Sequence, residues 1–220
     1  MYIRTDVIKP VCITILNSVE TVDSSNITDN LELLCDKNIL YISVTNREYF
    51  IKIKFDVNES SDFHATINAK LFLKLISQVT SELIEFTTDS TSLIIKANGS
   101  YKIPLIFDDD KLLELPVIVL HNVTNSFNID TAILNSIVKY NGRELNKSNF
   151  NYTRPVQRMY YLDEQGCITF TSGACVNNFS LPQPVKILFN QRLAKLFKLF
   201  NKIDTVQFNL GFDTISNNIM

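Results

Sequence analysis

A chain of 220 residues that is 45% hydrophobic and 20% charged has enough apolar side chains for one large or two modest cores. Its net charge of −2 and pI near 5.7 differ from the basic composition typical of nucleic-acid-binding domains. Arg4 and Asp6 are not followed by an apolar leader, and no uncharged apolar run reaches about 18 residues. This argues against secretion and membrane spanning and favours a cytoplasmic protein.

The first half of the chain alternates between helical and strand patterns. Helices are predicted over residues 7–19 and 68–80, and because proline is tolerated only in the first turn, Pro10 places the start of the first helix near Lys9. Asn98-Gly99 is typical of a hairpin turn. Alternation of apolar and polar residues predicts strands over residues 38–44, 49–55, 82–87, 92–96 and 101–105. Helices combined with hairpins indicate an α+β domain.

A charged stretch closed by Pro116 marks the predicted boundary between two domains, residues 1–116 and 117–220. Asp108, Asp109 and Asp110 lie in this stretch. Clustered carboxylates are what Mg²⁺ needs, but consecutive loop residues seldom converge on one ion. A solvated linker is therefore favoured over a cation site, and no metal or cofactor is implied.

The second half of the chain repeats the first. The segment from Asn68 to Leu75 matches that from Asn190 to Phe197 at an offset of 122, and the helix after Asp6 matches one after Asp130. Helices are accordingly predicted over 131–143 and 190–203. The first unit continues for 30 residues after Phe86, to Pro116, whereas 12 residues follow Phe208. We expect the second unit to lack its last strands, which either a longer chain or another chain would supply.

Acidic and basic residues are distributed unevenly between the four predicted helices and the rest of the chain. Together they contain none of the 23 Asp and Glu residues but nine of the 21 Lys and Arg residues, although soluble helices normally mix both signs on the exposed face. At about 100° per residue the basic side chains fall on one face and the apolar ones, such as Leu71 and Leu75, on the other. The basic residues predicted to face a ligand are Lys70, Lys74, Lys139, Arg143, Arg192, Lys195, Lys198 and Lys202.

Three interpretations of this basic surface are open. Lys and Arg along helices, without aromatic platforms or Asn/Gln sets for base edges, would bind the phosphates of double-stranded DNA without reading its sequence. The alternative is a duplicated α+β interaction module that binds an acidic protein partner without DNA. Each helix taken singly is also compatible with an ordinary solvated face.

The residues that an enzyme would need are scarce. His64 and His121 are the two histidines, neither lies in a recognisable nucleophile motif, and no phosphate-binding glycine loop occurs among five glycines. Cys12, Cys35, Cys167 and Cys175 form no C-x-x-C pair, and they are predicted to be reduced and mostly buried rather than metal ligands or disulfides. We predict that the protein is not an enzyme.

Two stretches resemble the bacterial DNA polymerase III beta subunit, the sliding clamp. They run from Thr66-Ile67-Asn68-Ala69-Lys70 through Tyr101-Lys102-Ile103-Pro104-Leu105 to Pro116, and from Arg154-Pro155-Val156 through Gly166-Cys167-Ile168-Thr169-Phe170 to Gly173. The resemblance covers nearly the whole chain at low identity. The chain's Asn, Ile and Lys usage and its divergence give the further hypothesis of a phage-encoded member.

The resemblance implies duplicated clamp domains, each with two helices packed on antiparallel sheets. In such a ring the helices line a hole that encircles duplex DNA, and the ring tethers the replicative polymerase. The family's DNA-facing basic residue at the start of the second helix corresponds to Lys70, and the internal repeat makes Arg192 its counterpart. The implied partners are DNA, peptides of the polymerase and the clamp loader, and further copies in a ring-forming homo-oligomer, with no membrane.

The family also binds partner peptides in an apolar pocket, and four residues here fall at pocket positions: Arg154, Thr171, Gly173 and Val176. The family's usual Asp-Gly-His-Arg-Leu reads Ser172-Gly173-Ala174-Cys175-Val176, so pocket specificity is open. Both a two-domain chain forming a trimeric ring and a three-domain chain forming a dimeric ring fit the pattern.

Overall fold

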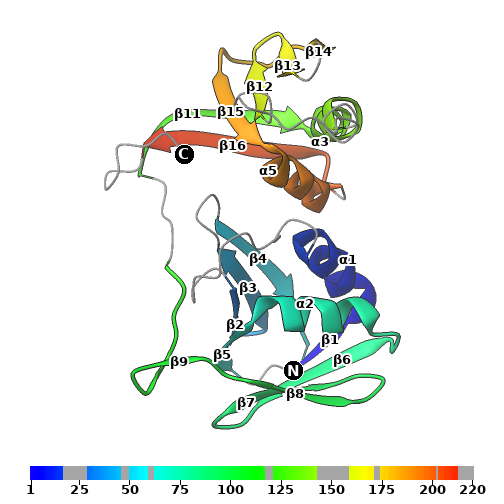
Figure 1. Ribbon diagram of the computed structural model, residues 1–220, viewed down its shortest axis with the longest axis vertical. Helices are drawn as coiled ribbons and strands as arrows, with labels where there is room; N and C mark the ends of the chain where they lie inside the picture. The colour runs from blue at the N-terminus through cyan, green and yellow to red at the C-terminus, as the bar shows by residue number, and fades with distance from the viewer. Residues whose placement is uncertain are drawn as a thin grey trace. The chain divides into compact units, whose positions relative to one another are not determined.

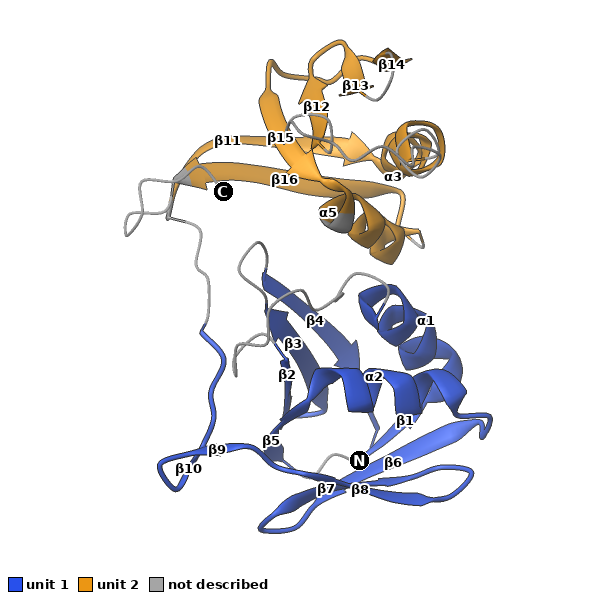
Figure 2. Cartoon of the chain, viewed as in Figure 1, with its two compact units in different colours: residues 1–118 blue, residues 119–220 orange. Residues whose placement is uncertain are grey.

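The chain divides into two compact units, residues 1–118 and residues 119–220 (Figure 2). The computed structural model describes residues 1–16, 29–45, 50–58, 62–116, 121–142, 159–170, 174–201 and 203–212. Each unit encloses an apolar core of its own.

The described residues of unit 1 form two helices and two four-stranded antiparallel sheets, with a small hairpin after them (Figure 1). The first sheet has the order β1-β6-β7-β8 and the second the order β4-β3-β2-β5. The helices are α1 (Thr5–Leu16) and α2 (Ala69–Gln78). The strands are β1 (Tyr2–Arg4), β2 (Asn30–Asp36), β3 (Ile39–Thr45), β4 (Phe50–Asp56), β5 (Phe63–Asn68), β6 (Leu83–Thr88), β7 (Ser92–Lys96), β8 (Ser100–Pro104), β9 (Phe107–Asp108) and β10 (Lys111–Leu112).

Unit 1 is itself built from a repeated strand-helix-three-strand pattern. β1, α1, β2, β3 and β4 form one copy, and β5, α2, β6, β7 and β8 form the other. Each copy places its first strand in the sheet of the other copy, because β1 pairs with β6 and β5 pairs with β2. This exchange joins the two sheets into one folded unit, and the sequence comparison missed it.

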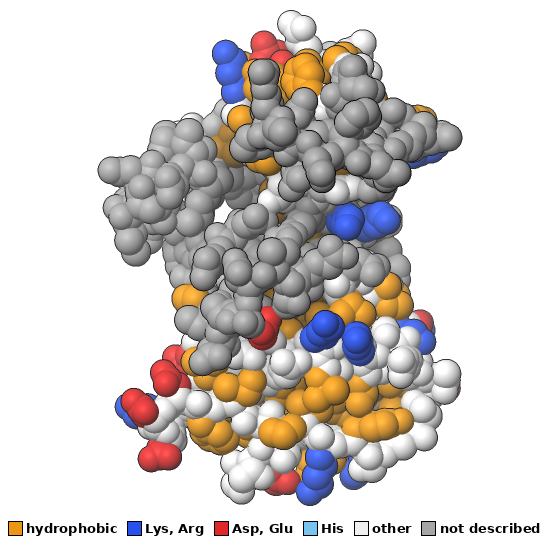
Figure 3. All heavy atoms as spheres, viewed as in Figure 1, with side chains coloured by type: hydrophobic (Ala, Val, Ile, Leu, Met, Phe, Trp, Pro, Cys, Tyr) orange, Lys and Arg blue, Asp and Glu red, His pale blue; other side chains and the backbone are white. Residues whose placement is uncertain are grey.

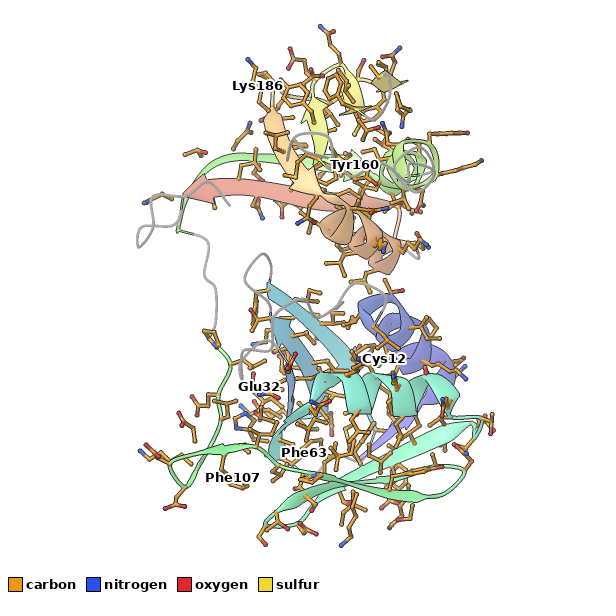
Figure 4. The ribbon with its side chains drawn as sticks, viewed as in Figure 1. Cys12, Glu32, Phe63, Phe107, Tyr160 and Lys186 are labelled. Atoms are coloured by element: carbon orange, nitrogen blue, oxygen red, sulfur yellow. The ribbon has the colours of Figure 1, made fainter. Side chains whose placement is uncertain are left out.

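Residue alternation explains how the sheets of unit 1 bury their inner faces. Leu31, Leu33 and Cys35 of β2 are buried, whereas the intervening Glu32 and Leu34 face outward, as the period of two in a strand requires. The helices α1 and α2 pack beside each other against the inner faces, with Cys12 of α1 fully buried (Figure 4). Burial raises the pKa of the Cys12 thiol to about 12.

The first helix begins earlier than the sequence predicts. α1 starts at Thr5 and includes Asp6, so this helix does carry one carboxylate, and Pro10 lies inside it rather than in its first turn. The pyrrolidine ring is exposed, and the backbone bond that proline removes would have ended on Asp6, within the first turn. The loss is therefore confined to one end of the helix, which explains why the prediction of a start near Lys9 was wrong.

The described part of unit 2 repeats this architecture with fewer strands in one sheet. A four-stranded antiparallel sheet has the order β14-β13-β12-β15, and β11 pairs with β16 in a two-stranded sheet. The strands are β11 (His121–Asp130), β12 (Met159–Asp163), β13 (Gly166–Phe170), β14 (Ala174–Asn178), β15 (Lys186–Asn190) and β16 (Thr205–Phe212). The helical segments are α3 (Thr131–Ser136), a π-helical turn η1 (Ile137–Asn141), α5 (Gln191–Leu196) and a 3-10 segment η3 (Phe197–Phe200).

The internal repeat holds at the level of single hydrogen bonds. The side chain of Asn68 caps α2 by accepting from the backbone N–H of Leu71 at 2.9 Å, and Asn190 caps α5 by accepting from Leu193 at 3.0 Å. The structure therefore confirms the predicted α+β fold with helices on antiparallel sheets. It corrects the pairing of Asp6 with Asp130, because Asp130 caps α3 whereas Asp6 lies within α1.

Candidate nucleic-acid interface

Helix α2 separates basic and apolar residues most clearly. Ala69, Phe72, Leu73 and Ile76 are buried, whereas Lys70 and Lys74 are exposed and lie one turn apart on the same face. Figure 3 shows Lys and Arg side chains gathered over α2. Leu71 was predicted to face the core, but 48% of its surface is exposed beside the two lysines. The exposed face of α2 is therefore basic with one apolar residue.

Helix α1 contributes little charge to this surface. The Nζ of Lys9 donates a 2.7 Å hydrogen bond to the carbonyl oxygen of Val79, just beyond α2, which ties the two helices together. The exposed residues Val7, Pro10 and Ile13 are apolar. The one carboxylate of α1, Asp6, forms an ion pair with Arg4.

The corresponding helical segment of unit 2 carries one described exposed lysine. Lys139 lies in the π-helical turn η1 with its Nζ 5.0 Å from the centre of the Tyr140 ring. The turn is held over the sheet by the buried side chain of Asn141, whose Nδ2 donates to the carbonyl oxygen of Cys167 at 3.1 Å. This irregular turn thus places a cation on an exposed face.

Segments α5 and η3 also present lysines. Lys198 is exposed and Lys195 is half-buried, while Leu196 is buried and Phe197 belongs to the core of unit 2. The prediction assumed a regular α-helix through residue 203, but the helix changes to 3-10 geometry at Phe197. Residues in a 3-10 helix are about 120° apart rather than 100°. The regular helical spacing from which the grouping of the four basic residues was predicted therefore ends at Leu196.

Some of the predicted site residues lie outside what the structure describes. The backbone of Arg192 belongs to α5, but its side chain is outside the description. Arg143 and Lys202 lie outside the described residues, as do Arg154, Thr171 and Gly173 of the predicted peptide pocket. Val176 of that pocket lies on β14 and is 53% exposed.

Ion pairs within the described part of the chain lie away from the helical lysines. They join Arg4 with Asp6, His64 with Glu32, Lys96 with Glu85, and Lys102 with Asp89, all on strands, turns or the start of α1. Among the described residues, no carboxylate pairs with Lys70, Lys74, Lys139, Lys195 or Lys198. Their charge is therefore available to a polyanion.

The other candidate residues have structural explanations. The Nε2 of His64 on β5 is 2.7 Å from the Oε1 of Glu32 on the adjacent β2 (Figure 4 labels Glu32), so this histidine belongs to a cross-strand pair. Asp109 and Asp110 form the exposed turn of the β9–β10 hairpin with positive φ angles. Within the described ranges, no cluster of three or more His, Cys, Asp or Glu residues could hold a metal ion.

The cysteines are free thiols, three of them buried and Cys175 half-buried, as predicted. Burial raises the pKa of Cys167 to about 12. In the described part of the chain, no helix has the length and apolar character needed to cross a membrane.

Comparison with proteins of known sequence identifies bacterial relatives over part of the chain. A beta sliding clamp of Helicobacter pylori (strain J99) is 34% identical over 99 residues, which represent 44% of this chain and 26% of the clamp. The clamp of Helicobacter pylori strain 26695 is 35% identical over 99 residues. No protein-family model matches the chain.

Comparison with solved structures extends the likeness to nearly the whole fold. The sliding clamp of Pseudomonas aeruginosa, solved with griselimycin, superposes with a TM-score of 0.75 at 14% identity, over 96% of this chain and 59% of that one. The beta subunit of Thermotoga maritima gives a TM-score of 0.74 at 15% identity and is also covered over 59% of its length. A Helicobacter pylori clamp bound to a DNA ligase peptide gives a TM-score of 0.64 at 18% identity.

The chain spans between a quarter and about three fifths of these relatives. Its two units, each with two helical segments on antiparallel sheets, correspond to the clamp fold. Sequence and structure together confirm the resemblance of this chain to the bacterial DNA polymerase III beta subunit, the DNA sliding clamp.

Proposed function

We propose that the chain is part of a DNA sliding clamp, a processivity factor whose ring encircles duplex DNA and tethers the replicative polymerase. The observation that carries the proposal is the charge separation in both units. Lys70 and Lys74 on α2, and Lys139 and Lys198 in unit 2, are exposed on helical segments with no carboxylate partner among the described residues.

Such a surface suits binding that must not stop the protein on one sequence. Lysines contact phosphates as point charges and carry no information about bases, so binding would depend steeply on salt and weakly on sequence. Because the whole chain carries a net charge of −2, attraction to DNA would depend on where the lysines gather and not on the overall charge. Mobility along duplex DNA follows from this combination.

Closing a ring requires contacts between several copies of the chain. Two edge strands support this part of the proposal, because β8 ends the first sheet of unit 1 and β14 ends the four-stranded sheet of unit 2. Edge strands present unpaired backbone groups to which another strand can pair. We therefore propose that the chain assembles into a ring-forming homo-oligomer. We also propose that it binds peptides of the polymerase and the clamp loader in a pocket that includes Val176.

The test compares retention on closed and open DNA. The chain is incubated with a nicked circular duplex and with a linear duplex of the same length, and then filtered to separate bound from free protein. An assembled clamp stays on the circle and leaves the linear DNA, and cutting the circle releases it. Equal retention on both forms, or no effect of blocking the linear ends, contradicts the proposal.

Charge reversal identifies the surface responsible. Lys70→Glu with Lys74→Glu should abolish retention on circles, while the matched pair Lys52→Glu with Lys54→Glu, on exposed positions of β4, should preserve it. Replacing Lys70 and Lys74 by Ala should lower the slope of log affinity against log salt by about 1.8, at roughly 0.9 per lost phosphate contact. Equal effects of the two reversed pairs would assign binding to overall charge.

One observation favours a second function. Leu71 is 48% exposed beside Lys70 and Lys74, and an apolar residue next to cations suits an acidic protein partner better than a phosphate backbone. Under this alternative, Leu71→Ser would abolish capture of the partner. DNA retention is expected to be unchanged by the same substitution if the clamp proposal holds.

A further inference from the structure

The first helix of each unit begins with a threonine, but the two hydroxyl groups have different surroundings. The backbone N–H of Thr5, at the start of α1, donates to the carbonyl oxygen of Glu82 at 2.9 Å. In the same way the backbone N–H of Thr131, at the start of α3, donates to Asp204 at 3.0 Å. The Thr131 hydroxyl is also bonded to the carbonyl oxygens of Ile203 and Asp204. The Thr5 hydroxyl, by contrast, is buried and has no hydrogen-bond partner.

A groove adjoins Thr5 in unit 1. It lies between α1 and residues 79–82, which connect α2 to β6 (Figure 1), and its volume is about 910 Å³. Binding sites for small molecules have volumes of about 300–1,000 Å³. Thr5, Lys9 and Ile13 line the groove and are spaced four residues apart, so they lie on one flank of the helix. The buried hydroxyl therefore belongs to the wall of a groove that is large enough for a ligand.

Lys9 keeps hydrogen-bond donors for such a ligand. Its half-buried Nζ donates one bond, to a backbone carbonyl just beyond α2, and an ammonium group has three N–H donors. Asp6 and Glu82 also line the groove, but among the described residues neither forms an ion pair with Lys9. Lys9 and Thr5 thus offer N–H and O–H donors one helical turn apart. A carboxylate, which accepts through two oxygens, matches this pair of donors.

An apolar surface continues from these donors along α1. Pro10 and Ile13 are exposed there, and Val79 lines the opposite side of the groove. The same side carries the hydroxyl groups of Thr80 and Ser81, which suit the polar backbone of an extended chain. The groove therefore combines donors for a carboxylate with an apolar wall beside them.

We propose that this groove binds the C-terminal end of an extended peptide whose last side chain is apolar. The terminal carboxylate accepts from the Lys9 Nζ and the Thr5 hydroxyl, and the last side chain packs on Pro10 and Ile13. Capture of a C-terminal carboxylate by directed donors is a recurring mode of peptide recognition. The volume of about 910 Å³ favours a peptide over a small carboxylate. This inference does not depend on DNA binding.

Net charge has little part in this recognition. The groove is lined by two cations, Arg4 and Lys9, and by two carboxylates, Asp6 and Glu82. Asp6 is paired with Arg4, and Glu82 lies close enough to Arg4 to help raise its pKa. Selectivity for a carboxylate therefore depends on the placement of the Lys9 and Thr5 donors, which substitutions can test one at a time.

Two peptides that differ in one group test the proposal. The isotope-labelled 220-residue chain is titrated with acetyl-Ala-Ser-Ala-Leu that ends in a free carboxylate, and with the same peptide ending in a neutral amide. We expect the amide signals of residues 5–13 and 79–82 to shift and to saturate at 1:1 stoichiometry with the acid. The neutral peptide should bind about tenfold more weakly, because it lacks the charged acceptor. Equal affinities, no binding, or shifts spread over other apolar surfaces overturn the proposal.

Thr5→Val separates recognition of the ligand from folding. Because the Thr5 hydroxyl has no partner in the free protein, its removal should not lower the free energy of unfolding. Affinity for the acid peptide should nevertheless fall about tenfold, and Thr5→Ser, which keeps the hydroxyl, should retain it. Unchanged affinity of Thr5→Val, or a clear loss of its stability, would assign the hydroxyl to the fold and overturn the proposal.

Lys9→Met keeps the apolar stem of the side chain and removes the ammonium group. This variant should lose the preference for the acid over the neutral peptide, whereas Lys54→Met, at an exposed position of β4, should keep it. A preference that persists in Lys9→Met overturns the proposal. Octanoate provides the last comparison. If it displaces the acid peptide at equal concentration, the groove selects small carboxylates and the peptide assignment is wrong; retention of the peptide supports the assignment.

Discussion

Helix α2 of unit 1 runs as a regular α-helix for ten residues, whereas its counterpart in unit 2 changes to a 3-10 helix after the six residues of α5. Both begin with an asparagine whose side chain accepts from the backbone N–H three residues on, so the capping hydrogen bond does not account for the difference. α2 packs on a core that includes Leu93, Ile95 and Ile103 from the β7–β8 hairpin. Among the described residues of unit 2, no equivalent hairpin contributes to the core beneath α5. Tertiary packing, more than local propensity, maintains a short helix.

The first helical segments of the two units, α1 and α3–η1, differ in the same way. α1 is regular over twelve residues despite Pro10, while the segment after Asp130 changes from α3 to a π-helical turn at Ile137. Asn141 ends that turn with its side chain fully buried and bonded to the carbonyl oxygen of Cys167. Unit 2 thus uses a buried polar anchor where unit 1 uses continuous apolar packing.

Truncation of equivalent phenylalanines should show the difference in packing most strongly. Phe86 is fully buried with its ring 6.0 Å from that of Phe72, so Phe86→Ala should destabilise unit 1 by about 3–5 kcal/mol. Phe208→Ala should cost unit 2 roughly half as much, because less apolar surface leaves water there. Urea titration with hydrogen exchange resolved by peptide fragment measures each unit separately. Equal losses would mean that the two cores are equally complete.

The turns between equivalent strands provide a second comparison. Gly166 is the first residue of β13 and has φ of +152°, and a Cβ there would lie 2.2 Å from the carbonyl oxygen of Asn177. Gly166→Ala should therefore destabilise unit 2 by about 1–3 kcal/mol through strain and displacement of β14. In unit 1 the residue at the matching register position is Ile39, and the positive φ angle lies in the turn before it, where Asn38 has φ of 65°. Asparagine tolerates this conformation, so Asn38→Gly should change the free energy of unfolding little. If Gly166→Ala leaves the free energy of unfolding unchanged, β14 can shift away from the added methyl group at little cost.

The two asparagine caps should have smaller and more equal effects. Asn68→Ala and Asn190→Ala each remove an acceptor for a backbone N–H at a helix start, which should cost about 1 kcal/mol. Asn68→Asp and Asn190→Asp keep an acceptor and serve as controls. Far-UV circular dichroism and urea titration measure the change. A loss restricted to Asn68→Ala would indicate that the short α5 is fixed by packing alone.

These comparisons show which features were predictable from sequence. The asparagine caps, the Asn98-Gly99 turn and the α+β architecture follow from local chemistry and period, and all of them are present. The exposure of Leu71 was not predicted because the exposed arc of α2 depends on where α1 packs beside it. The early start of α1 was missed because the cost of Pro10 depends on its distance from the helix start.

The candidate site was predictable in kind more than in detail. Lys70 and Lys74 lie four apart on a regular helix, and helical geometry places both on one face. Lys195 and Lys198 lie on either side of a change to 3-10 geometry, and no signal in their spacing announces that change. The π-helical turn that carries Lys139 depends on the buried amide of Asn141, a tertiary interaction that periodicity does not contain.

The smallest expected effect on stability comes from a substitution in the turn between β6 and β7, which has no described counterpart after β16. The Asp89 carboxylate accepts hydrogen bonds from the backbone N–H groups of Thr91 and Ser92 at 2.9 and 2.7 Å, and these bonds lower its pKa. A lowered folded-state pKa stabilises the protein above the unfolded value of about 3.9, and the contribution is lost as the pH falls through the folded value. Wild type should thus exceed Asp89→Asn slightly in stability above about pH 5. The difference should shrink towards zero as the pH falls below about 4, because wild-type Asp89 becomes neutral like its amide replacement. Thermal unfolding of unit 1 from about pH 6 down to about pH 2 measures the difference. A difference that grows on acidification would mean that the backbone donors do not prefer the charged carboxylate.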